Sequence, residues 1–157
     1  MSWSNYEKAI NLMKQNKDEC DFVGERSEIL VEKAETTLGI RFSKTYRHFV
    51  KNYGAGNFGS QEVYGVTHGD FDNASVPNAI WYTLTERKET DLPDNYLVIY
   101  DTGMGDVFCL DFNKLNEENE PAVVAIYLGV AWSEQSFEII ADDFGDFLLE
   151  IFQDEIE

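Results

Sequence analysis

The run from Gly54 to Gly59 reads Gly-Ala-Gly-Asn-Phe-Gly and matches the dinucleotide-binding pattern G-x-G-x-x-G at every position. In a dinucleotide site this pattern follows a strand and opens a helix, so that the phosphates lie at the helix N-terminus. Here the run follows a predicted helix and precedes a strand-like segment, which is the reverse order. We therefore interpret its glycines as a helix stop and a close turn, and we expect no cofactor.

Aspartates gather near one predicted hairpin, where Asp101, Asp106 and Asp111 occur, and in the loop that holds Asp70 and Asp72. Clustered carboxylates can bind Ca²⁺ or Mg²⁺, but no EF-hand spacing is present. Asp106 and Asp111 are five positions apart, so on one straight strand their side chains would face opposite sides. We expect no metal site, and we interpret Asp101 as a turn residue that bonds to backbone.

Histidine and cysteine are sparse, with only His48, His68, Cys20 and Cys109 in the chain. Zinc needs three or four closely spaced ligands, and a thiol nucleophile needs a nearby base. His48 is expected on the solvated side of its helix and His68 in a loop. We expect free thiols in a reducing compartment, although a disulfide or a Cys–His pair in space stays open. G-x-S-x-G, Walker A and HExxH motifs are all missing, so the sequence predicts no enzyme.

Helices are predicted for most of the first 54 residues. A capping box at Ser4–Glu7 begins the first helix, residues 14–26 read as a loop, and Ser27 and Gly39 delimit the second helix. Ser43 and Gly54 delimit the third. Its apolar stripe has the spacing i, i+3, i+4, i+7 that marks an amphipathic helix. That stripe consists of Tyr46, Phe49, Val50 and Tyr53.

Strands are predicted for most of the rest of the chain, and glycines 103 and 105 join two of them in a tight hairpin. The predicted strands are Glu62–Thr67, Tyr96–Tyr100, Asp106–Asp111, Val123–Leu128 and Phe137–Ala141. Residues 75–87 favour a helix that begins at Ser75 and Pro77, although Ile80–Thr83 has strong β propensity. Asp142 or Asp143 caps a final helix.

These patterns predict an α+β fold with N-terminal helices, a central mainly antiparallel β-sheet and a C-terminal helix. The chain has 157 residues, 43% of them hydrophobic and 14% aromatic, which is typical of one globular domain covering residues 1–157. No apolar run reaches 18 residues, and the N-terminus lacks the basic and apolar regions of a signal peptide. We therefore expect a cytoplasmic protein.

The stretch Ile40–Gly65 resembles the signature of the SUKH superfamily, whose members include bacterial toxin-immunity proteins and yeast cell-wall-assembly regulators. That signature is a short aromatic helix, an Asn-x-Gly turn, a Gly/Phe segment and an apolar strand that ends in Tyr-Gly. The matching residues are Tyr46, Phe49, Asn52, Gly54, Phe58, Gly59, Tyr64 and Gly65. The family usually has Leu-Pro before this helix, where this chain has Phe42-Ser43. The order of the later motifs extends the resemblance over nearly the whole chain.

The formal net charge is −18, from 30 acidic and 12 basic residues, and no Lys or Arg follows Lys114 although twelve acidic residues do. Such charge disfavours nucleic acid and anionic membranes as partners and favours a basic protein. Plain solubility is the alternative explanation. We expect a monomer.

The resemblance implies an immunity protein that binds a secreted toxin, for which a basic nuclease domain is the expected partner. A regulatory interaction module, or a small enzyme with an unrecognised site, stays open. The family's partner contacts vary, so the predicted binding face follows from loop placement and charge alone. It comprises Asp101, Asp106, Glu117, Glu118, Glu120 and Trp132.

Overall fold

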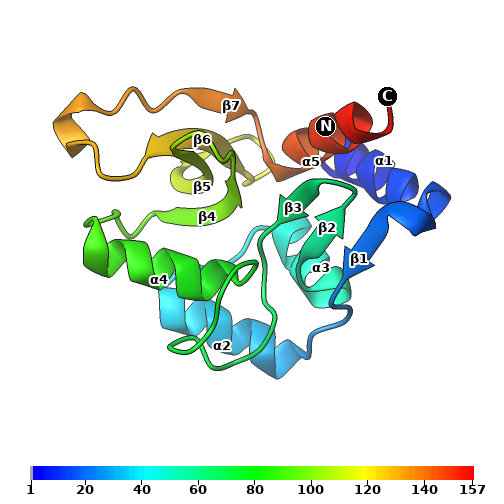
Figure 1. The fold of residues 1–157 in the computed structure, drawn as a ribbon, viewed down its shortest axis with the longest axis horizontal. Coiled ribbons are helices and arrows are strands. Elements are labelled where there is room, and N and C mark those ends of the chain that lie inside the picture. The colour runs from blue at the N-terminus through cyan, green and yellow to red at the C-terminus, as the bar shows by residue number, and fades with distance from the viewer. Residues whose placement is uncertain (1) are drawn as a thin grey trace.

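The computed structural model describes residues 2–157 as an α+β fold, which confirms the predicted class (Figure 1). The helices are α1 (Ser2–Gln15), α2 (Glu28–Leu38), α3 (Lys44–Tyr53), α4 (Ala79–Glu89) and α5 (Phe144–Ile156). The strands are β1 (Cys20–Phe22), β2 (Gly56–Phe58), β3 (Gln61–Val63), β4 (Tyr96–Asp101), β5 (Asp106–Leu115), β6 (Pro121–Tyr127) and β7 (Ile139–Ala141). Two short 3₁₀ turns lie at Lys17–Glu19 and Trp132–Glu134.

The strands form two antiparallel sheets rather than one. The smaller has the order β1-β2-β3 and the larger has the order β4-β5-β6-β7. A hydrogen bond from Tyr64 N to Ile99 O, 2.9 Å long, links the chain after β3 to the edge of β4. The two sheets are therefore joined by backbone contact, and that edge of the larger sheet is covered.

Aromatic side chains join α1, α3 and α5 in the core. Phe144 at the start of α5 lies edge-on to Tyr46, with ring centroids 5.1 Å apart, and 5.5 Å from Phe49. Tyr6 of α1 lies 6.3 Å from the same ring. Such edge-to-face and tilted pairs suit the quadrupoles of aromatic rings. Helices α1 and α5 consequently lie side by side, with both termini at one end of the molecule (Figure 1).

Local signals located several helix ends correctly. Ser27 caps α2 through a 3.1 Å bond from Leu30 N, and Gly39 ends that helix in the left-handed conformation. Asp143, one of the two predicted caps, accepts a 2.9 Å bond from Asp146 N at the start of α5. The preferred helix over residues 75–87 is confirmed as α4.

Other boundaries differ from the prediction. Helix α1 is already formed at Ser2, so the capping box at Ser4–Glu7 is wrong; the Asn5 side chain instead donates to Asp146 in α5. Helix α4 is capped by Asn78 rather than Ser75. Residues 14–26 contain β1, and the strand predicted over 62–67 is only β3. Strands of three residues are too short to show a period in the sequence, and the partner of β1 is the distant strand β2.

Glu120 lies beside β6 and serves as a remote cap for α3. Ser43 occupies the N-cap position but makes no side-chain cap bond. Instead Glu120 Oε2 accepts from Thr45 N at 3.2 Å, and Glu120 Oε1 accepts from the Thr45 hydroxyl at 2.6 Å. A carboxylate at this position satisfies an otherwise unpaired helix N–H and suits the positive end of the helix dipole. Glu120 is only 2% exposed, so its predicted place on a partner surface is wrong.

We expect Glu120→Ala to lower the free energy of unfolding by about 2–4 kcal/mol, because Thr45 would keep two buried donors without an acceptor. Urea denaturation measures this change. The matched control is Glu117→Ala in the same loop, where the exposed side chain predicts a change within about 0.5 kcal/mol. Equal effects of the two substitutions would contradict the capping role of Glu120.

Candidate partner-binding surface

The residues predicted to form one binding face lie at two ends of the larger sheet. Asp101 and Asp106 flank the β4–β5 turn, whereas Glu117 and Glu118 belong to the β5–β6 loop. Strand β5 has 10 residues between these turns, which corresponds to about 30 Å. Successive hairpin turns lie at opposite ends of an antiparallel sheet, so these groups do not form one contiguous face.

At the β4–β5 turn, Asp101 and Asp106 have different environments. Asp101 is exposed, and its Oδ1 accepts from Gly103 N at 2.9 Å, which confirms its interpretation as a turn residue. Asp106 is only 9% exposed, and its Oδ1 accepts from the Thr102 hydroxyl at 2.5 Å. Asp106 is thus part of the turn and unsuited to the predicted partner surface.

At the other end, Glu117 and Glu118 line an acidic cleft between the β5–β6 loop and the start of α5. The cleft has a volume of about 410 Å³. Its lining, as far as the chain is described, contains five carboxylates and no basic residue. The lining residues are Leu115, Asn116, Glu117, Glu118, Asp142, Asp143 and Asp146.

Three of these carboxylates, from Asp142, Asp143 and Asp146, have oxygens within 4.8 Å of one another and could hold a cation. This group was not among the predicted sites, although its spacing at a helix start is visible in the sequence. The fold already uses it, because Asp143 caps α5 and Asn116 Nδ2 donates to Asp142 at 3.2 Å and to Asp143 at 3.1 Å. The arrangement therefore has a structural explanation without a metal ion.

Trp132 lies in the long connection between β6 and β7, which projects from the end of the molecule opposite α1 and α5 (Figure 1). Its side chain is half-buried, and its indole Nε1 donates to Thr90 O at 3.0 Å. This bond fixes the connection against the end of α4. Trp132 thus has a structural role and also retains exposed surface.

The signature residues are predominantly internal. Tyr46, Phe49, Phe58 and Tyr64 are buried. Val66 N donates to Gly54 O at 3.1 Å, and a Cβ atom on Gly65 would overlap that same carbonyl oxygen. The glycine is required there by close backbone approach.

His48 does not face solvent as predicted. It is half-buried, and its Nδ1 lies 2.7 Å from the Tyr6 hydroxyl oxygen on α1, within hydrogen-bond distance. Burial, and then the charge of Lys14, lower the pKa of His48. The prediction failed because α1 covers this side of α3, which the local sequence of α3 does not reveal.

Both cysteines are free thiols, as predicted. Burial, followed by the charge of Asp111, raises the pKa of the Cys109 thiol. Burial, followed by the charge of Glu19, also raises the pKa of Cys20. Raised pKa values keep thiols protonated and unreactive, which is the opposite of what a nucleophilic cysteine requires.

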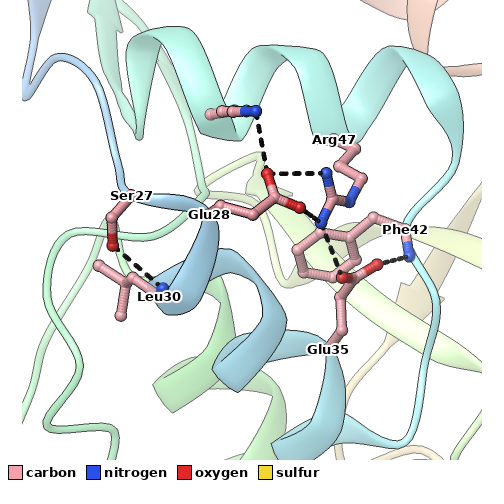
Figure 2. A network of polar contacts seen from close by, with 7 residues as sticks. Ser27, Glu28, Leu30, Glu35, Phe42 and Arg47 are labelled. Carbon is pink, nitrogen blue, oxygen red and sulfur yellow. Dashed lines mark hydrogen bonds and ion pairs between the residues drawn. The ribbon is translucent and has the colours of Figure 1, made fainter.

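A second cleft, of about 610 Å³, lies between α2, α3 and the segment that joins them. Figure 2 shows ion pairs between α2 and α3 beside this cleft: Arg47 pairs with Glu28, and with Glu35 at 3.5 Å. Lys51 adds a 2.9 Å pair to Glu28, and Glu35 Oε2 accepts from Phe42 N at 2.8 Å. Arg47 and Glu35, which both line this cleft, thus connect the two helices.

Comparison with protein families matches residues 28–148 to the SMI1-KNR4 cell-wall family, SUKH_6. Because the match covers most of the chain, this protein belongs to the SUKH superfamily, as the signature residues predicted. In the described part of the chain, none of the helices is long and apolar enough to span a membrane.

We expect Arg47→Met to raise the pKa of Glu28 from about 2 towards its ordinary value of 4.5, since hydrogen bonds from Arg47 and then Lys51 lower it. Because the folded-state pKa is depressed, the stabilisation from this pair is present above pH 4.5 and is lost as the pH falls towards 2. An NMR titration of the Glu28 carboxyl carbon measures the shift. Arg41→Met, in the same cleft, serves as the control, and an unchanged midpoint in Arg47→Met would contradict the prediction.

Proposed function

We propose that this protein is an immunity protein that binds a cognate secreted toxin stoichiometrically and blocks its basic nuclease domain. Membership of the SUKH superfamily is consistent with an immunity role or a regulatory protein-interaction role. The observation that favours immunity is the uneven distribution of charge along the chain, because it provides a field that attracts a basic protein.

Basic and acidic residues are distributed unevenly along the chain. Nine of the 12 basic residues lie in the first 51 positions, together with eight of the 30 acidic residues. The other 106 positions hold three basic and 22 acidic residues. Helices α1, α2 and α3 are therefore nearly neutral in sum, and the larger sheet, α4 and α5 carry the negative charge.

This charge supports fast recognition of a cationic surface. A nuclease domain that holds nucleic acid presents basic side chains, and an acidic partner can occupy that surface or exclude the substrate from it. Electrostatic steering raises association rates by about 10- to 1,000-fold, and the effect decreases steeply with ionic strength. Binding of this kind requires no catalytic residues of the immunity protein.

A regulatory protein-interaction module is the second candidate, favoured by the cell-wall description of the matched family. A growth assay distinguishes the two. The toxin domain encoded next to this protein is expressed in susceptible cells with and without it. Rescue of growth together with a co-purifying complex supports immunity. Death in both cultures, with this protein abundant, would exclude that toxin and favour the regulatory candidate.

We expect the association rate constant for the toxin domain to fall at least about tenfold between 50 and 500 mM salt, measured by stopped-flow fluorescence. Salt shortens the Debye length from about 10 Å at 0.1 M to about 3 Å at 1 M and so screens the attraction. Dissociation should change much less, because short-range contacts govern it. An association rate that salt leaves unchanged would contradict steering by charge.

A further inference from the structure

The connection between β6 and β7, residues 128–138, projects from the end of the molecule opposite α1 and α5 (Figure 1). We call this segment the projecting loop. Apolar side chains are exposed where it begins: Tyr127, the last residue of β6, is 43% exposed and Val130 is 41% exposed. Trp132 follows and is half-buried. Single exposed apolar residues are ordinary, but here they lie close together on a segment that projects, which is typical of a surface that contacts a partner.

Side-chain hydrogen bonds hold the start of the projecting loop in one conformation. The amide group of Gln135 reaches back across the loop, where its Oε1 accepts from Tyr127 N at 3.0 Å. Its Nε2 donates to Tyr127 O at 2.5 Å and to Val130 O at 3.2 Å. Gln135 thus pairs with backbone groups much as a neighbouring strand would. A loop that is fixed before binding loses less conformational entropy when a partner contacts it.

Two aromatic residues fix the rest of the projecting loop to the body of the molecule. The bond from Trp132 Nε1 to Thr90 O connects the loop to the end of α4. Further along, the ring of Phe137 stacks on the buried ring of Tyr96, with centroids 6.2 Å apart and planes at 11°. Phe137 has a φ of +52°, in the left-handed region that bulky residues rarely adopt. Such a conformation persists only where the surrounding contacts impose it, so the loop is preorganised along its length.

The charges of the projecting loop are negative. Glu134 and Glu138 are exposed, and the loop contains no Lys or Arg. At the end of α4, where the loop is fixed, exposed Lys88 is outnumbered by exposed Glu89 and Asp91. Apolar contacts surrounded by charged groups are the usual anatomy of a protein interface. The complementary surface is therefore apolar at its centre and basic at its rim.

The shape of the loop restricts the partner further. A projecting, preorganised loop inserts into a concave surface, as long binding loops of other proteins do. A nuclease domain is concave and basic where it holds nucleic acid, so shape and charge select the same region of the partner. The acidic loop itself disfavours nucleic acid, and it repels the same loop of a second copy.

We propose that the projecting loop is the segment that enters the basic nucleic-acid-binding cleft of the toxin domain. Tyr127, Val130 and Trp132 make its apolar contacts, and Glu134 and Glu138 pair with basic side chains at the rim of that cleft. This inference rests on the proposed function, because it assigns the surface through which the toxin domain is bound. Gln135 acts as a positioning residue, since it holds the backbone that carries Tyr127 and Val130.

The first experiment measures the affinity of variants for the toxin domain by isothermal titration calorimetry. We expect Y127S/V130S to weaken the complex by about tenfold to a hundredfold, because it removes apolar contacts from the interface. The matched control L115S/I156S removes side chains that are 51% and 41% exposed elsewhere, and should weaken the complex by less than about threefold. Thermal unfolding checks that both variants fold. Equal weakening by the two variants would overturn the loop as the contact and leave the immunity function intact.

The second experiment tests the cleft by competition with a fluorescein-labelled phosphorothioate oligonucleotide bound to the toxin domain. The wild-type protein should displace the oligonucleotide, and Y127S/V130S should require a concentration at least about tenfold higher. A ternary complex with the oligonucleotide, in a protein that still rescues growth, would overturn this inference and retain the immunity function. A wild-type protein that does not bind the toxin domain would contradict both for that toxin. Self-association of the wild type that Y127S/V130S abolishes would assign the loop to a second copy and overturn the proposal.

Discussion

The buried contact between Glu120 and Thr45 connects the two halves of the molecule. Glu120 belongs to the approach to β6, and Thr45 belongs to the first turn of α3. The contact orients helix α3, which carries Tyr46 and Phe49 towards Phe144. A carboxylate is well suited to this position, because one group satisfies a backbone N–H and a hydroxyl at once. The acidic composition of the chain therefore contributes to its interior as well as to its surface.

The elements that were predicted correctly from the sequence are those whose capping or stop signals act on neighbouring residues. The ends of α2 and the cap of α5 follow from Ser27, Gly39 and Asp143, each of which acts on neighbouring residues. Strand β1 was missed because three residues show no periodicity and its partner β2 is distant along the chain. The burial of Glu120 was missed for the same reason: a charged residue in a polar loop reads as exposed unless its distant partner is known.

The candidate sites show the same limit. Asp101 was selected from its loop position and is indeed exposed. The acidic cleft around Glu117 and Glu118 was not predicted, because only the tertiary fold brings the β5–β6 loop beside the start of α5. The signature residues, by contrast, pack mainly inside the molecule. The family resemblance of this chain therefore indicates its fold. The surface that recognises a partner can change while the signature residues are retained.

The position of Phe144 also affects how the chain folds during synthesis. Tyr6, Tyr46 and Phe49 all pack on this ring, yet the ribosome adds about 100 residues between Tyr46 and Phe144. At about 5–20 residues per second, that interval is roughly 5–20 s. During this time the N-terminal helices present an aromatic face that has no ring to cover it. Nascent chains are thus exposed to chaperones and proteases until α5 emerges.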